Sequence, residues 1–343
     1  MSGKRRILLS LDGGGSRGLF ALNILILLKH CLGIKLCDTF GLAVGSSVGA
    51  IVAALLAFGI LDSDSNILDR VLALGRVMFK GKPLINGLFS PIYSGKEKHA
   101  GLKELFGTLT MKDTHLPICI ITTNVDGRVR YICSWNPEDA NILVADALCA
   151  SAAAPIYFPP VRIGADFLVD GGVTNNNPIG ATLLASLRMV PGDLHVKILS
   201  IGTHVAVDGT KAAPDDMSNM GIGQWFGGEH DLIGLIMGDG DTTEQQLAEA
   251  LIGKDNVLRV SCDIKARLDM LDDSTVNALL CETVRVWHRD ASALREFVAP
   301  ESSSNTIDCL AYTDSLLSRV VAGADPHQCH SFADRIANAV PRS

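Results

Sequence analysis

The sequence lacks the paired cysteine spacings that mark a disulfide framework or a zinc site. Its nine cysteines are scattered along 343 residues, mostly within apolar stretches, and none forms a C-x-x-C motif. There is also no N-x-S/T acceptor site for N-glycosylation. Free cysteines in apolar surroundings usually behave as small core residues. These absences favour a reducing, intracellular setting, and we expect a cytoplasmic protein.

The chain also has no excess of positive charge and no recognisable leader. Its formal net charge of −7 argues against nucleic-acid binding and gives no general attraction to anionic membrane surfaces. The basic start, Lys4 to Arg6, is too short for a targeting signal. The apolar run from Leu42 to Leu61 is long enough to span a membrane, but small polar residues divide it into strand, turn and helix. We therefore expect neither a signal peptide nor a transmembrane span.

No internal repeat or low-complexity tract is present, and only a fifth of the residues are charged. Nearly half of the residues are apolar, so the chain is globular and long enough to bury a large core. A polar break at 300–305 separates a long predicted helix, 274–297, from a tail with little sequence signal. We assign residues 1–298 to the main domain and 299–343 to a C-terminal helical extension without an assigned role.

A glycine-rich loop near the N-terminus follows a strand that is apolar on both faces. Residues 7–11 predict the strand, Asp12 ends it, and the apolar pattern over 19–32 predicts a helix after the loop. The three glycines from Gly13 to Gly15 expose backbone N–H groups beside the positive end of that helix. The loop is therefore expected to bind an anion, which is either a phosphate or a transient oxyanion.

A second strand-turn-helix unit follows, and its turn carries a serine. Residues 42–44 predict the strand, Gly45-Ser46-Ser47-Val48-Gly49 is the turn, and 50–61 predicts an apolar helix. The turn has the G-x-S-x-G pattern of a nucleophile elbow, in which a serine on a strained turn exposes its hydroxyl. On neighbouring parallel strands, two such turns would place the glycine amides opposite the serine oxygen, as acyl transfer requires.

More strands ending in small-residue turns follow along the chain. Residues 116–122, 129–135, 167–169 and 195–201 predict strands, and the third of them delivers Asp170 into a glycine turn. In an open parallel sheet such turns collect along the carboxyl edge, where ligands bind. We therefore expect an α/β fold in which the glycine loop, the serine and the aspartate share one edge of the sheet.

Four motifs in this order resemble the patatin-like phospholipases. They are Asp12-Gly-Gly-Gly-Ser-Arg-Gly18, Gly45-x-Ser47-x-Gly49, Ala150-Ser-Ala-Ala-Ala-Pro-Ile-Tyr-Phe-Pro-Pro160 and Val169-Asp170-Gly171-Gly172. The resemblance covers about residues 7–202 and continues more faintly to Trp287. It implies a three-layer α/β/α fold with a mostly parallel central sheet. It also implies calcium-independent hydrolysis of fatty acyl esters in phospholipids or related lipids by a serine–aspartate dyad without a catalytic histidine.

The resemblance also assigns roles by position. It implies Ser47 as the nucleophile, Asp170 as the base, and the amides of Gly13, Gly14 and Gly15 as the oxyanion donors. It implies no metal and no cofactor, and a lipid substrate met by a peripheral protein at a membrane or micelle surface. The oligomeric state is not predicted. The residues expected to support the site are Asp12, Arg17, Gly18, Gly45, Gly49 and Gly171.

Chemistry sets one condition on this assignment. An ordinary aspartate is a poor base for a hydroxyl, so the site must raise the pKa of Asp170 by apolar burial or tune it by hydrogen bonds. Asp12 is expected to hold the glycine loop by accepting backbone N–H bonds, and Arg17 to stiffen it.

Two other functions are compatible with the residues. A nucleotide- or phosphate-binding protein would use residues 13–18 as a G-x-G-x-x-G loop, a weak signal when it stands alone. An α/β-hydrolase-type esterase would add a histidine after the acid, and the sequence offers His195, His204 and His230. That fold has several strands before its elbow, whereas here only one convincing strand precedes Ser47.

Two long segments between the predicted elements each have two interpretations. Residues 80–98 form either a lid or wall of an acyl pocket or an ordinary surface loop. Residues 205–241 are glycine-rich and carry scattered apolar side chains, so they either contact a lipid surface or pack over the sheet.

Overall fold

The computed structural model describes residues 6–79, 91–203, 241–262, 264, 269, 271–299, 313, 315 and 318. The predictions made for 205–240, for His204 and for His230 fall outside these residues. So do most of the loop predicted over 80–98 and nearly all of the predicted C-terminal extension.

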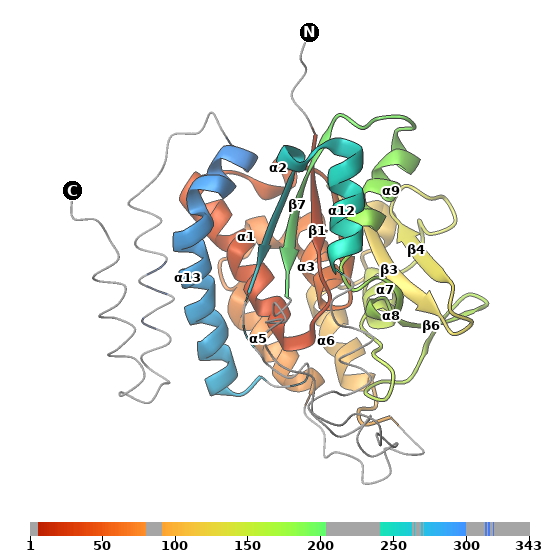
Figure 1. The fold of residues 1–343 in the computed structure, drawn as a ribbon. Helices are drawn as coiled ribbons and strands as arrows, with labels where there is room; N and C mark the ends of the chain where they lie inside the picture. The colour runs from red at the N-terminus through yellow and green to blue at the C-terminus, as the bar shows by residue number, and fades with distance from the viewer. Residues whose placement is uncertain are drawn as a thin grey trace, which may run out of the picture.

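A mixed eight-stranded sheet forms the middle layer (Figure 1). The strand order is β5-β6-β3-β2-β1-β7-β8, and the eighth strand, β4, pairs with β3 in addition to the neighbours in this order. Strands β3, β2, β1, β7 and β8 are parallel to one another, whereas β4, β5 and β6 join by antiparallel pairing at one side. The bounds are β1 Arg6–Leu11, β2 Phe40–Ser46, β3 Ile118–Asn124, β4 Val129–Cys133, β5 Val161–Ile163, β6 Asp166–Asp170, β7 Val196–Gly202 and β8 Val257–Ser261.

Helices cover both faces of this sheet, so the predicted three-layer α/β/α class is confirmed (Figure 1). One layer contains α1 Gly18–Leu32, α3 Val48–Ala57, α7 Val144–Ser151 and α13 Asp273–Val298. The other contains α9 Ile179–Met189 and α12 Asp241–Ile252. The remaining helices are α2 Leu36–Thr39, α4 Ile60–Ser63, α5 Ile67–Met78, α6 Lys96–Phe106 and α8 Gly172–Asn175.

The central strand β1 packs on both faces. Leu8 belongs to the core on the α9 and α12 side, whereas Leu9 and Leu11 belong to the core on the α1 and α3 side. Successive side chains of a strand point to opposite faces, so a strand covered on both sides is a continuous apolar run. This is why residues 7–11 could be identified from the sequence.

The apolar run 42–61 is confirmed as strand, elbow and helix rather than a membrane span. One described helical window, Gly15–Leu32, is long and apolar enough to cross a membrane, and 78% of it is buried inside the protein. A core helix satisfies the same test of length and composition. Here α1 packs against α3 and α13.

Two local predictions were wrong. The helix expected over 50–61 stops at Ala57 and restarts at Ile60, because Gly59 adopts a left-handed conformation with φ of 71°. Cys31 is disulfide-bonded, which the cysteine spacing did not indicate.

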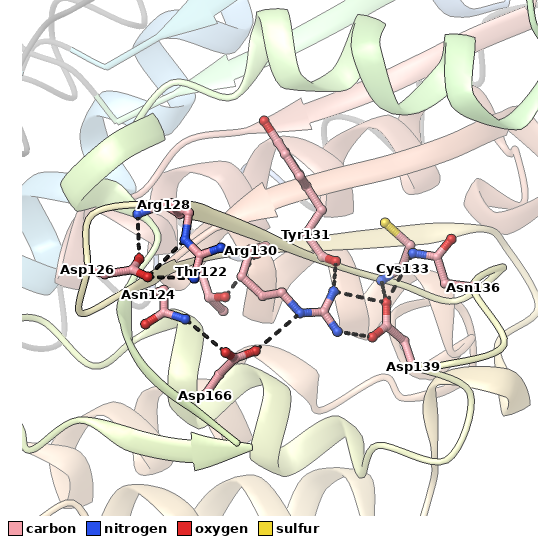
Figure 2. Close-up of polar contacts among 10 residues, drawn as sticks. All are labelled: Thr122, Asn124, Asp126, Arg128, Arg130, Tyr131, Cys133, Asn136, Asp139 and Asp166. Atoms are coloured by element: carbon pink, nitrogen blue, oxygen red, sulfur yellow. Dashed lines mark hydrogen bonds and ion pairs between the residues drawn. The ribbon is translucent and has the colours of Figure 1, made fainter. Parts of the chain in front are cut away.

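A polar network secures the antiparallel side of the sheet (Figure 2). Arg130 on β4 pairs with the buried carboxylate of Asp139, and its Nε lies 3.9 Å from Oδ2 of Asp166. Asp166 is the first residue of β6, and it also accepts a 2.9 Å hydrogen bond from Asn124 at the end of β3. These contacts hold the start of β6 beside β3, and they thereby help to place its last residue, Asp170.

Candidate active site

Ser47 occupies the sharp turn between β2 and α3. Its backbone has φ of 53° and ψ of −125°, a conformation that a non-glycine residue keeps only where its surroundings enforce it. A Cβ on Gly45 would lie 2.4 Å from the carbonyl carbon of Gly49, and a Cβ on Gly49 would lie 2.3 Å from the carbonyl oxygen of Leu11. The G-x-S-x-G spacing is therefore a packing requirement of this turn.

The Asp170 carboxylate faces the Ser47 hydroxyl. Ser47 Oγ donates a 2.7 Å hydrogen bond to Asp170 Oδ2, and the N–H of Gly172 donates a 2.7 Å hydrogen bond to Oδ1. Both side chains are buried. Burial raises the pKa of Asp170 to about 6, and the hydrogen bonds from Gly172 and Ser47 partly oppose this rise. The carboxylate is thus a stronger base than an ordinary aspartate and already contacts the serine proton.

Asp170 reaches this position by a different route from the one expected. We expected a parallel strand ending at the carboxyl edge, but β6 runs antiparallel to β3. In the register of the sheet, Ser46 pairs with Ile121, and Asp170 pairs with Thr122. Since β4 pairs with one edge of β3 over 119–123, β2 and β6 both pair with the other edge, one after the other. Asp170, opposite Thr122, therefore comes next to Ser46, opposite Ile121, at the point where the chain leaves β2 for Ser47.

The C-terminal end of α7 forms hydrogen bonds with the backbone N–H groups of Ser47 and Asp170. The N–H of Ser47 donates a 3.0 Å hydrogen bond to Ser151 Oγ, which donates in turn to the carbonyl of Ile121 at 2.6 Å. The N–H of Asp170 donates to the carbonyl of Ala153 at 3.0 Å. The sequence analysis included 150–160 among the four motifs, but the role of the Ser151 side chain was missed. Only the fold brings this hydroxyl to the elbow.

The glycine loop lies against the elbow, and one predicted donor is already engaged. A Cβ on Gly13 would lie 3.2 Å from the Cβ of Ser47. The N–H of Gly13, however, donates a 2.9 Å hydrogen bond to the carbonyl of Asn176. The Gly13 amide is thus engaged within the protein, and its role as an oxyanion donor stays a prediction. Within the described residues, the N–H groups of Gly14 and Gly15 have no hydrogen-bond acceptor.

Asp12 is anchored by an arginine that the sequence did not indicate. Its Oδ2 lies 2.6 Å from Nη2 of Arg259 on β8, and its Oδ1 lies 3.2 Å from Nη1. We expected Asp12 to accept backbone N–H bonds, which stays a prediction; the described contact of its carboxylate is this two-point ion pair, which holds the start of the glycine loop. Arg17 Nε donates to the carbonyl of Gly14 at 3.3 Å, in line with the expected stiffening.

Two other supporting glycines allow close packing. A Cβ on Gly18 would lie 2.3 Å from the side chain of Val48, so glycine allows α1 to approach the elbow helix. A Cβ on Gly171 would lie 2.3 Å from the carbonyl oxygen of Ile121, so glycine allows the chain after Asp170 to pass over β3.

An apolar pocket contacts the dyad. Its walls come mainly from α3 and α5, together with Phe79, Tyr157 and Phe158, and both Ser47 and Asp170 face it. A largely apolar cavity with a few convergent polar groups is the usual form of a site for a small apolar ligand. Its lining is almost entirely apolar, apart from Ser47, Asp170 and a few other polar groups.

No histidine lines this pocket in the described part of the chain. His195 is exposed and precedes β7 at its N-terminal end, whereas Ser47 follows the C-terminal end of β2, and both strands run parallel to β1. His195 therefore lies at the opposite edge of the sheet from Ser47. Across the described residues, no group of three or more histidine, cysteine or acidic side chains is placed to hold a metal ion.

Comparisons with known proteins agree with this geometry. A family model described as patatin-like phospholipase matches residues 9–183, a range that contains both Ser47 and Asp170. A cGAMP-activated phospholipase of Pseudomonas aeruginosa is 30% identical over 254 residues, which are 71% of this chain and 74% of that protein. Patatin-like protein 4 of Arabidopsis thaliana is 26% identical over 323 residues, 79% of this chain and 80% of the relative.

Other matches are shorter or more distant. A cGAMP-activated phospholipase of Escherichia coli is 30% identical over 217 residues, and the match spans 57% of this chain and 61% of that protein. Among solved structures, VipD from Legionella pneumophila aligns with 96% of this chain and 82% of its own at 14% identity, with a TM-score of 0.36. That structural likeness is too low to bear on function.

Proposed function

Because the chain belongs to the patatin-like phospholipase family of lipid acyl hydrolases, we propose that it cleaves fatty acyl esters of phospholipids or related lipids through Ser47 and Asp170. The observation that carries this proposal is the 2.7 Å hydrogen bond from Ser47 Oγ to Asp170 Oδ2 at the wall of an apolar pocket. Such a pair supplies a nucleophilic hydroxyl and an acceptor for its proton.

In the proposed reaction, Asp170 accepts the Ser47 proton while Oγ attacks the ester carbonyl carbon. The N–H groups of Gly14 and Gly15 stabilise the negative charge that develops on the carbonyl oxygen. The tetrahedral intermediate collapses to acyl-Ser47, and Asp170 returns its proton to the departing alcohol. A water molecule then attacks the acyl-serine and gives its proton to Asp170. The fatty acid leaves, and Ser47 takes its proton back.

Both the nucleophile and the base of the dyad are side chains of this protein, and the proposed steps use no metal ion. We therefore propose that hydrolysis is independent of calcium. Long-chain esters are aggregated lipids, and the enzyme would therefore meet them as a peripheral protein at a membrane or micelle surface. The phosphate-binding alternative for residues 13–18 has less support, because the Gly13 amide is engaged by Asn176 and the loop lies against Ser47.

The test is hydrolysis of mixed phospholipid vesicles in the presence of a calcium chelator, with products identified by mass spectrometry. Two relatives are named for activation by cGAMP, so each assay is run with and without that nucleotide. We expect free fatty acid in at least one condition, together with covalent labelling of Ser47 by a fluorophosphonate. An absence of both hydrolysis and labelling in every condition would exclude the proposed function.

The pH dependence of hydrolysis should report the ionisation of Asp170. The base acts only when ionised, and burial raises its pKa to about 6. We expect kcat/KM to rise with pH, to reach half of its plateau near pH 6 and to be level above about pH 7. The measurement uses a soluble short-chain ester, which separates chemistry from lipid binding. A half-maximum near the ordinary aspartate value, about pH 4, would contradict the assignment.

A further inference from the structure

Lys98 is a buried lysine that the proposed reaction does not use. It lies on α6, and only 2% of it is exposed. Its Nζ donates hydrogen bonds to the carbonyls of Ala152 at 2.7 Å and Cys149 at 3.1 Å, and it lies 3.9 Å from the centroid of the Phe158 ring. The ammonium therefore caps the C-terminal end of α7, where unpaired carbonyls and the helix dipole favour a cation.

The turn that Lys98 caps is the turn that holds the dyad. Ser151 lies between the two capped residues, and its Oγ accepts the N–H of Ser47. Ala153 follows directly, and its carbonyl accepts the N–H of Asp170. One short segment thus connects the ammonium to the nucleophile and to the base.

We propose that Lys98 is a positioning residue, which orders the end of α7 and sets its positive charge near Asp170 so that the Ser47–Asp170 pair stays in its reactive arrangement. The effect of Lys98 on catalysis rests on the proposed function, in which Ser47 and Asp170 carry out the reaction. Burying an ammonium carries a large desolvation cost, and a methionine of similar length would fill the space without that cost. Packing by itself therefore does not account for a lysine at this position.

The charges around Lys98 agree with this role. Burial lowers the pKa of Lys98 to about 8, so the ammonium is mainly protonated at neutral pH. Two titratable groups act on it, and they are Cys149 on α7 and Asp170 on β6. Burial raises the pKa of Cys149 to about 11, which leaves Asp170 as the anion. The positive charge of Lys98 in turn lowers the pKa of Asp170 against the larger effect of burial. Close by, His99 of α6 pairs with Asp146 of α7 at 2.6 Å.

The test compares Lys98→Gln, Lys98→Met and Lys98→Arg with the wild type. Lys103→Met is the matched control, because Lys103 is exposed on the same helix. The titration of Asp170 is followed by infrared difference spectroscopy of isotope-labelled aspartate, and its band is identified by its loss in Asp170→Asn. This measurement needs no turnover, so it stands apart from the test of lipid hydrolysis.

Lys98→Gln removes the positive charge but keeps an N–H donor for the two carbonyls. The pKa of Asp170 should therefore rise by about one unit, and the pH at which kcat/KM is half-maximal should rise by the same amount. Lys98→Met also loses the hydrogen bonds, and kcat should fall at least about tenfold while KM changes less than about twofold. Lys98→Arg should recover most of kcat, and Lys103→Met should match the wild type.

An unchanged Asp170 titration and an unchanged kcat in folded Lys98→Gln would overturn the proposal. If Lys98→Met does not fold, the Gln and Arg variants decide the question. A failure of the proposed function would look different, since the wild type itself would then hydrolyse no lipid. The spectroscopic comparison would still show whether Lys98 acts on Asp170.

Discussion

Ser47→Ala is expected to lower kcat for ester hydrolysis by at least about 1,000-fold, with the fold intact. Alanine removes the hydroxyl that contacts Asp170 Oδ2 and faces the acyl pocket. The exchange deletes a single oxygen from a nearly buried side chain, so the turn itself should persist. Release of fatty acid measures the loss, and fluorophosphonate labelling should disappear in parallel.

The neighbouring serine provides a matched control for this variant. Ser46 is also buried, and its Oγ has no hydrogen-bond partner among the described residues. Ser46→Ala should therefore keep most of the wild-type kcat and the full extent of labelling. Wild-type turnover in Ser47→Ala would exclude Ser47 as the nucleophile. A loss of activity in both variants would indicate damage to the elbow rather than to the chemistry.

Asp170→Asn tests the base and separates catalysis from stability. The amide cannot take the serine proton, and we expect kcat to fall by about 100-fold to 10,000-fold. Burial raises the pKa of Asp170 from 3.8 to about 6, which means that the folded protein favours the protonated carboxyl group. This contribution to stability is complete below pH 3.8 and is lost as the pH rises through about 6. At pH 8 the uncharged variant should therefore be the more stable protein, by up to about 3 kcal/mol. Chemical denaturation at pH 8 measures this difference.

Arg259→Met is expected to lower the free energy of unfolding by about 3–5 kcal/mol. Arg259 forms a two-point pair with Asp12, and the two side chains are only 10% and 1% exposed. Methionine would leave the Asp12 carboxylate in the core without its counter-charge. It would also remove the 2.6 Å hydrogen bond from Arg259 Nη1 to Ser200 Oγ. Urea denaturation followed by circular dichroism measures the change.

Two comparisons make the Arg259 result specific. Asp12→Asn combined with Arg259→Met removes both charges of this pair and should recover part of the lost stability, because residue 12 then no longer carries a buried negative charge. Arg128→Met breaks an exposed pair with Asp126, in which the arginine is 79% exposed, and should cost less than about 1 kcal/mol. If Arg259→Met costs no more than Arg128→Met, the buried pair is not an anchor of the glycine loop.

Glycine spacing accounts for much of what could be predicted of the site. Gly49 stands where a side chain would collide with the Leu11 carbonyl, and Gly18 stands where one would collide with Val48. These requirements fall on glycines at fixed positions within two short turns, so they leave a short and readable pattern. Lys98, Ser151 and Arg259 left no such pattern, because each acts on a partner that lies far away in the sequence.

The sequence by itself determined the buried parallel strands and the elbow, because strand periodicity and turn glycines are local properties, and the resemblance of its motifs to a family implied the pair of Ser47 and Asp170. The tertiary structure decided how these parts meet. It brings Asp170 to Ser47 on an antiparallel strand through pairing with Thr122, although 123 residues separate the two side chains. It also engages the Gly13 amide with Asn176 and pairs Asp12 with Arg259, 247 residues further on. Strand direction and register at such separations depend on the packing of the whole sheet, and no local pattern encodes them.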